Sequence, residues 1–114
     1  MTPEMLKMYE KLQKKFKGKG WKRQPGDWFY NKKSKTLLNC GADAILIHKD
    51  IWLPLPIDPV NPERGLWGMV DWKSYELITT SAGELAIWGR TMKRSICTSP
   101  TEALLKVLMA QEGL

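Results

Sequence analysis

The first apolar pattern along the chain is that of an amphipathic helix over residues 1–17. Apolar side chains recur every three or four residues and would share one face of that helix: Met5, Met8, Tyr9, Leu12 and Phe16. Thr2 suits the N-cap, Pro3 suits the first helical position, and the glycines in KGKG at 17–20 predict the end. A helix with such a stripe must bury it, and a second copy of the chain is one available partner.

Between residues 26 and 97 the pattern is mainly that of β-strands. QPGD at 24–27 predicts a type II turn, followed by a strand from residue 28, a polar hairpin loop at 31–35 and a return strand at 36–39. The apolar segment DAILIH at 43–48 predicts a buried strand that could reach residue 53. Residues 75–80 and 84–88 predict a second hairpin, with residues 90–97 as a continuation of its second strand.

Residues 99–112 carry the strongest helix pattern in the chain. Ser99, Pro100 and Glu102 fit the N-cap, the first helical position and the third, which together make a capping box. Residues 103–110 are apolar except for Lys106, so this helix should be buried on more than one side. We therefore expect a single α+β domain: a curved antiparallel sheet of about four or five strands with the C-terminal helix packed on it, and the N-terminal helix packed less tightly.

Length and composition are those of a folded protein. The chain has 114 residues, 43% of them hydrophobic, which is enough for one core. No apolar run approaches the roughly 20 residues of a membrane span. The N-terminal residues alternate between apolar and charged, unlike a signal peptide. We expect a soluble, cytoplasmic protein.

Groups that could support catalysis or bind a metal are few. The single histidine, His48, follows an apolar segment, and Cys40 and Cys97 lack the paired spacing of a zinc site. Isolated cysteines in an intracellular chain are more often buried thiols than a disulfide. Turn residues and strand-end caps are the simplest interpretation of four aspartates, Asp43, Asp50, Asp58 and Asp71. Since hydrolase, metalloprotease and phosphate-loop motifs are also missing, we expect no enzyme, no metal and no cofactor.

Positive charge is concentrated near the N-terminus. Residues 1–35 hold eleven Lys/Arg and three Asp/Glu, a net of +8, whereas residues 36–114 hold seven and nine, a net of −2. Basic groups that contact phosphates and an indole that stacks on bases would suit a nucleic acid. The candidate residues are Lys14, Lys15, Lys17, Lys19, Trp21, Lys22 and Arg23. The competing interpretation, which we prefer, is that lysines on the outer face of a helix are simply solvated.

A second candidate surface flanks a proline-rich segment at 54–65. Its four prolines are incompatible with a helix or a central strand, so we expect an ordered surface loop. Apolar residues on either side could form an exposed protein-docking patch: Trp52, Leu53, Leu66 and Trp67. The same residues could instead close over a small core as a lid, and this second interpretation is preferred.

Three stretches resemble small phage- and prophage-encoded proteins of Gram-positive bacteria. They are WKRQPGDWFY, IWLPLPIDP and the tail TSPTEALLKVLMAQEG, and the similarity covers about residues 20–112. The long PIDPVNPERG loop and Gln24 beside the proline depart from that pattern. The family has no assigned activity, so the resemblance implies an accessory phage protein of the host cytoplasm and no particular site residue. The expected function is non-enzymatic binding to another protein or to itself as a homodimer, with nucleic-acid binding as the alternative.

Overall fold

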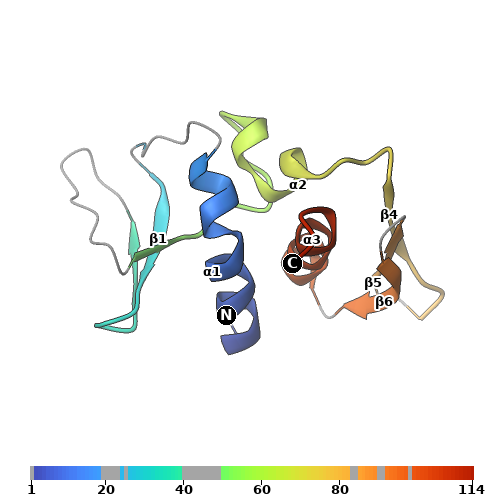
Figure 1. Ribbon diagram of the computed structural model, residues 1–114, viewed down its shortest axis with the longest axis horizontal. Coiled ribbons are helices and arrows are strands. Elements are labelled where there is room, and N and C mark those ends of the chain that lie inside the picture. The colour runs from blue at the N-terminus through green and yellow to red at the C-terminus, as the bar shows by residue number, and fades with distance from the viewer. Residues whose placement is uncertain are drawn as a thin grey trace.

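The computed structural model describes residues 2–18, 24, 26–39, 50–82, 85–89, 92–97 and 99–114, with the backbone alone at 15–18 and 92–94. Its elements in chain order are α1 (Pro3–Gly18), β1 (Trp28–Asn31), β2 (Thr36–Asn39), β3 (Asp50–Trp52), the 3₁₀-helix η1 (Pro62–Arg64), α2 (Leu66–Met69), β4 (Tyr75–Thr79), β5 (Leu85–Gly89), β6 (Met92–Cys97) and α3 (Pro100–Gln111). The architecture is α+β, which confirms the predicted class (Figure 1). Within the described residues, no helix combines the length and the apolar character needed to cross a membrane.

The described strands form two separate antiparallel sheets, so the prediction of one sheet with four or five strands is wrong. The N-terminal sheet has the order β2-β1-β3 and the C-terminal sheet the order β4-β5-β6. Prolines 54 and 56 follow β3 closely and offer no N–H to a sheet, so the chain leaves the N-terminal sheet after Trp52. Within each sheet, two strands that follow each other in sequence form a hairpin: β1 pairs with β2 and β4 pairs with β5, as predicted for 28–39 and 75–88.

Two further strand predictions have different outcomes. Residues 90–97 do not continue β5: that strand ends at Gly89, and β6 runs back antiparallel to it with Met92 opposite Gly89. A glycine at the end of a strand is a turn signal, and here it marks the reversal. The strand predicted at 43–48 falls in the part of the chain that the structure does not describe.

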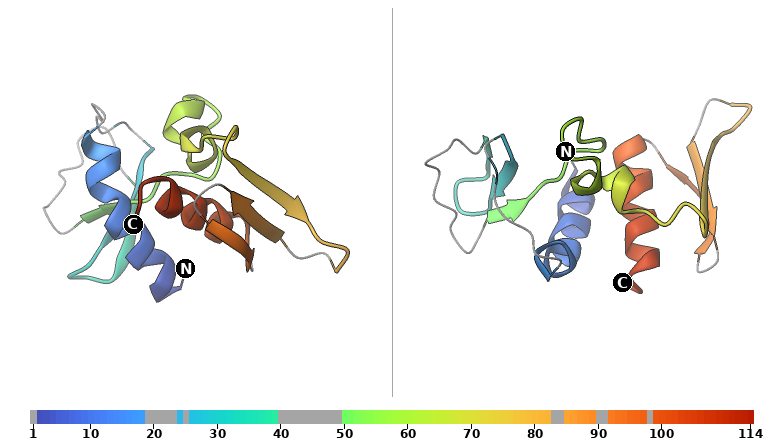
Figure 2. Two further views of the ribbon diagram at one scale, coloured as in Figure 1. Left: turned by 45° about the vertical axis from the view of Figure 1, so that its right-hand side comes forward. Right: turned by 90° about the horizontal axis from the view of Figure 1, so that it is seen from above.

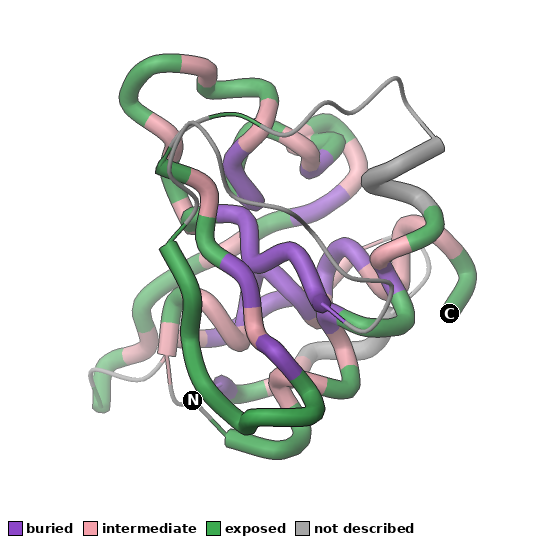
Figure 3. Tube along the Cα trace, turned by 90° about the vertical axis from the view of Figure 1, so that its left-hand side faces the viewer, coloured by how far each residue is buried: buried purple, intermediate pink, exposed green. Residues whose placement is uncertain are grey.

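Two helices separate the sheets. Helix α1 packs on β3 of the N-terminal sheet, α3 packs on β5 and β6 of the C-terminal sheet, and the two helices contact each other. Figures 1 and 2 show the resulting order of sheet, α1, α3 and sheet along the longest dimension of a molecule measuring 45 × 26 × 25 Å. Figure 3, which looks along the longest axis, shows the buried segments gathered towards the middle of the view and the exposed segments around them. Both helices contribute to this core.

Helix α3 has the cap and the burial that its sequence predicts. The Oγ of Ser99 accepts a hydrogen bond from the backbone N–H of Glu102 at 3.2 Å. Five side chains of the helix are no more than 3% exposed: Ala103, Leu104, Leu105, Val107 and Leu108. Consecutive buried positions cannot share a single face, so the helix is covered both by α1 and by the C-terminal sheet.

Helix α1 packs part of its apolar stripe into the core of its own chain. The Oγ1 of Thr2 accepts from the N–H of Met5 at 3.2 Å, which confirms the predicted N-cap. Tyr9 is 2% exposed and Leu12 is fully buried, and both belong to the core that α3 and β3 share. Met5 and Met8 are partly buried against the same core, and the side chain of Phe16 lies outside the described residues. The described part of the stripe that suggested a homodimer therefore packs within the protein itself.

Cys97 of β6 is a free thiol, buried in the same core. Its burial raises the pKa of the thiol above the ordinary value. Cys40 lies outside the described residues.

Candidate functional site

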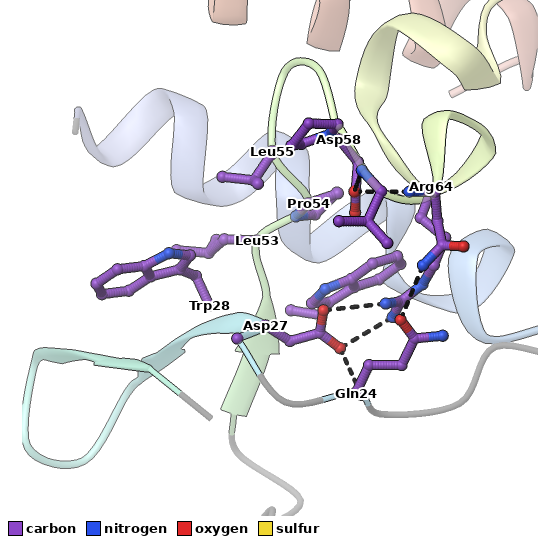
Figure 4. A pocket seen from close by; sticks show the side chains of 13 residues that line it. Gln24, Asp27, Trp28, Leu53, Pro54, Leu55, Asp58 and Arg64 are labelled. Atoms are coloured by element: carbon purple, nitrogen blue, oxygen red, sulfur yellow. Dashed lines mark hydrogen bonds and ion pairs between the residues drawn. The ribbon is translucent and has the colours of Figure 1, made fainter. Parts of the chain in front are cut away.

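A pocket opens where the start of β1, the end of β3 and the proline-rich segment 54–65 meet (Figure 4). Its volume is about 230 Å³. Figure 4 shows Trp28 and Leu55 on one side and the group formed by Gln24, Asp27 and Arg64 on the other. The pocket thus has an apolar side and a polar side.

Hydrogen bonds hold the proline-rich segment in place. The N–H of Leu53 donates to the carbonyl of Trp28 at 2.8 Å, and the N–H of Leu66 donates to the carbonyl of Leu55 at the same distance. Gly65 permits a close approach, because a Cβ there would lie 2.7 Å from a backbone nitrogen on the opposite limb of the loop. The segment is a loop, as predicted, except that its end forms the short 3₁₀-helix η1, in which Pro62 occupies the first position and needs no N–H partner. The loop forms one wall of the pocket.

The turn at 24–27 positions Asp27. The N–H of Asp27 donates to the carbonyl of Gln24 at 3.2 Å, and Gly26 has φ of +92°, as the third residue of a type II turn requires. The Oδ2 of Asp27 also accepts from the N–H of Gln24 at 2.9 Å. This local bond helps to orient the Asp27 carboxylate.

The distant partner of Asp27 is Arg64 of η1. The guanidinium donates two bonds to the carboxylate, Nη1 to Oδ1 at 3.1 Å and Nη2 to Oδ2 at 2.9 Å. The two side chains are only 13% and 10% exposed. The guanidinium also lies 5.1 Å from the ring centroid of Trp52. A bidentate, nearly buried pair is geometrically specific, so it locks the loop to the start of β1.

The apolar side of the pocket is exposed to solvent. Trp28 is 40% exposed, Leu55 is 41% exposed and Val60 is 81% exposed. In β1 the exposed Trp28 alternates with the buried Phe29, so the sheet geometry turns one large ring outward and the next one inward. Sequence reasoning missed these three residues, although the period-two alternation of β1 is the signal that could have found Trp28.

The predicted docking patch is only partly on the surface. Trp52 and Leu53 are 3% and 5% exposed and Leu66 is fully buried, so these three residues are not available as an exposed docking surface, and their burial agrees with the lid interpretation. Leu66 packs in the core, and the Arg64 guanidinium covers the Trp52 ring. Trp67 remains 45% exposed and stacks on Trp72 with ring centroids 4.3 Å apart.

The candidate nucleic-acid residues lie mostly beyond the described positions. Lys14 is exposed on α1, while the side chains of Lys15 and Lys17 and the whole of Lys19, Trp21, Lys22 and Arg23 are not described. Lys7 and Lys11 are exposed and precede Lys14 at helical spacing. The described part of the chain thus shows a lysine stripe on α1, without placing Trp21 beside it.

The described aspartates outside the Arg64 pair have structural partners. Oδ1 of Asp58 accepts from the N–H groups of Val60 and Asn61, both at 2.9 Å. Oδ2 of Asp71 accepts from the hydroxyl of Ser74 at 2.9 Å. These contacts confirm the turn interpretation of both aspartates. Asp50 accepts at 2.9 Å from the Asn31 amide inside the N-terminal sheet, and Asp43 and His48 belong to the segment left undescribed.

The titratable side chains of the pocket therefore support its architecture. Asp27 and Arg64 hold each other, and Asp58 holds the loop. Among the described residues, no three His, Cys, Asp or Glu side chains lie close enough together to bind a metal ion. Comparison of the chain with protein-family models, with curated proteins and with solved structures found no match.

Proposed function

We propose that the protein is a non-enzymatic binding module that docks a partner protein at the pocket between β1 and segment 54–65. The supporting observation is a preformed pocket that exposes Trp28 and Leu55 opposite the nearly buried Asp27–Arg64 pair. Large aromatic side chains beside fixed polar groups are typical anchors of protein interfaces. A pocket that is already formed loses little free energy to ordering when it binds.

The resemblance to small phage and prophage proteins supports an accessory role in the host cytoplasm. The partner would be another protein or a second copy of the chain, joined at the pocket rather than along α1. Sedimentation of the purified protein at micromolar concentration distinguishes these two partners, because only the second gives a dimer.

A display library of random nine-residue peptides, screened against the full chain, tests the docking proposal. We expect enriched peptides with dissociation constants in the micromolar range, near −8 kcal/mol. Val60→Asn should weaken them severalfold, because it replaces an apolar side chain by a neutral polar one on the apolar side of the pocket, at an 81% exposed position. Leu114→Asn is the control, since Leu114 is 51% exposed and does not line the pocket. Equal binding by both variants and the parent would contradict the proposal.

A second candidate function is nucleic-acid binding, favoured by the lysine stripe of α1. Lys32 in the β1–β2 turn forms an ion pair with Glu10 at 2.6 Å, which brings that lysine-rich turn beside α1. Binding by such a surface should weaken with salt by a slope of roughly −0.7 to −0.9 per phosphate contacted. Lys11→Glu combined with Lys14→Glu should abolish binding, and Trp21→Ala should weaken single strands more than duplex. Unchanged single-strand affinity in Trp21→Ala would remove Trp21 from this function.

A further inference from the structure

Among the described residues that line the pocket, negative charges outnumber positive charges. Two carboxylates, of Asp27 and Asp58, and one guanidinium, of Arg64, line it, which gives two negative charges against one positive. Arg64 is bound to Asp27 through both nitrogens, so Asp58 is the unmatched charge. Its Oδ1 accepts two backbone N–H bonds, while its Oδ2 has no partner among the described residues. This local negative charge stands in a chain whose net charge is +6.

Two amide side chains that line the pocket, those of Gln24 and Asn61, each have one hydrogen-bonding group that a ligand could use. The Oε1 of Gln24 accepts from the Nδ2 of Asn61 at 3.1 Å, so one end of each amide is used. The Nε2 of Gln24 and the Oδ1 of Asn61 form no hydrogen bond with other described residues. An N–H donor beside a carbonyl acceptor is the complement of a peptide group in an extended backbone.

The size of the pocket also indicates a side chain rather than a small molecule. Its volume of about 230 Å³ lies below the range of roughly 300–1,000 Å³ that is usual for small-molecule sites. The apolar side, formed by Trp28, Leu55 and Val60, would cover one aliphatic side chain or proline.

We propose that the occupant is an extended peptide segment in which an aliphatic residue or proline lies one or two positions from a lysine or arginine. The apolar side chain packs against Trp28, Gln24 and Asn61 hydrogen-bond the peptide backbone, and the basic group pairs with Asp58. This inference rests on the proposed docking function and specifies the ligand of the same pocket.

The peptides enriched in the display screen test the charge directly. Asp58→Asn removes the charge but keeps an oxygen that can accept the two loop N–H bonds, so the loop should keep its shape. Asp71→Asn is the matched control: it makes the same change in a turn aspartate that does not line the pocket. We expect Asp58→Asn to weaken enriched peptides about tenfold and Asp71→Asn to change binding less than twofold. Each peptide is also measured with its basic residue replaced by methionine, which should bind the parent and Asp58→Asn equally.

The outcomes separate this inference from the docking proposal. If the enriched peptides depend on Val60 but show no excess of lysine or arginine, or bind Asp58→Asn as tightly as the parent, docking stands and the basic ligand is overturned. If no peptide is sensitive to Val60→Asn, the docking proposal itself fails. Thermal melts of each variant are compared with that of the parent. An unchanged melting temperature shows that a variant that binds more weakly is still folded.

Discussion

The two ends of the molecule differ in the balance of apolar and polar contacts that hold them together. At the C-terminal sheet, α3 presents consecutive buried apolar side chains to β5 and β6. At the N-terminal sheet, polar side chains bridge elements distant in sequence. Gln13 of α1 accepts from the N–H of Trp52 in β3, and Asn31 donates to Asp50 inside the sheet. Burying such groups carries a desolvation cost, and the Nε2 of Gln13 is buried without a partner among the described residues.

The difference indicates that the two regions contribute differently to the stability and to the shape of the protein. Apolar burial is non-directional and stabilises in proportion to the area removed from water. Bidentate and side-chain-to-backbone hydrogen bonds add less net stability but fix relative positions. We infer that the C-terminal region supplies most of the folding free energy, while the polar contacts of the N-terminal region set the shape of the pocket.

The largest expected effect comes from the apolar region. Leu105→Ala should lower the free energy of unfolding by about 2–5 kcal/mol, because it leaves a cavity at a fully buried position of α3 in the core. Leu114→Ala, at a 51% exposed position past the end of α3, is the control and should change it by about 0.5 kcal/mol or less. Urea unfolding curves measure both. Similar midpoints for the two variants would show that α3 is peripheral to the core.

Breaking the Asp27–Arg64 pair should have the next largest effect. Arg64→Met leaves the nearly buried Asp27 carboxylate without its partner, at a cost of about 3 kcal/mol. Lys32→Met removes the Lys32–Glu10 pair, whose side chains are 47% and 50% exposed, and should cost under about 1 kcal/mol. Adding Asp27→Asn to Arg64→Met should restore part of the loss, because the unpaired charge is gone. If both single variants cost the same in urea unfolding, the Asp27–Arg64 pair does not lock the loop.

The sequence predicts the features that depend on neighbouring residues, and it does not predict those that depend on packing between distant elements. Both N-caps, the type II turn and the two hairpins depend on residues within a few positions of each other, and their local patterns predict them. The separation of the strands into two sheets was missed because it depends on where α1 and α3 pack between them. Strand patterns specify which residues pair locally, but not which sheet a strand joins.

The candidate site was the least predictable part. Asp27 and Arg64 are 37 residues apart, and an aspartate in a turn and an arginine after a proline each have ordinary local explanations. Trp28 begins a short strand and Trp52 ends one, yet Trp28 is exposed and Trp52 is covered by Arg64. Only the three-dimensional arrangement separates the ring that can bind from the ring that supports the loop.

Alkaline pH should weaken the contact between the two regions through Tyr9. Burial raises the pKa of Tyr9 from 10.0 to about 12. Above pH 10 the unfolded chain therefore loses the phenol proton while the folded chain keeps it, so stability falls as pH rises from 10 toward 12. The expected slope is about 1.4 kcal/mol per pH unit. Tyr9→Phe should reduce that slope in urea unfolding at pH 9 to 11, and an unchanged slope would mean that Tyr9 is accessible to water.

The smallest expected effect compares the N-caps of the two long helices. Ser99→Ala should cost about 1 kcal/mol and Thr2→Ala about 0.5 kcal/mol, although both cap bonds are 3.2 Å long. The Ser99 bond is partly buried and α3 belongs to the apolar core, so the loss of this bond should lower the free energy of global unfolding. The Thr2 bond is exposed, so the first turn of α1 can fray and water can replace the hydroxyl.

Ser81→Ala, in the exposed β4–β5 turn, is the control for removing a hydroxyl and should change stability by a few tenths of a kcal/mol at most. Hydrogen exchange of the Met5 and Glu102 amides measures each cap directly. Thr2→Ala should speed exchange of the Met5 amide with little change in the urea midpoint. Ser99→Ala should speed exchange of the Glu102 amide and also lower the urea midpoint. If Thr2→Ala costs as much as Ser99→Ala in urea, α1 unfolds together with α3, and the N-terminal region shares the stability that we assign to the C-terminal one.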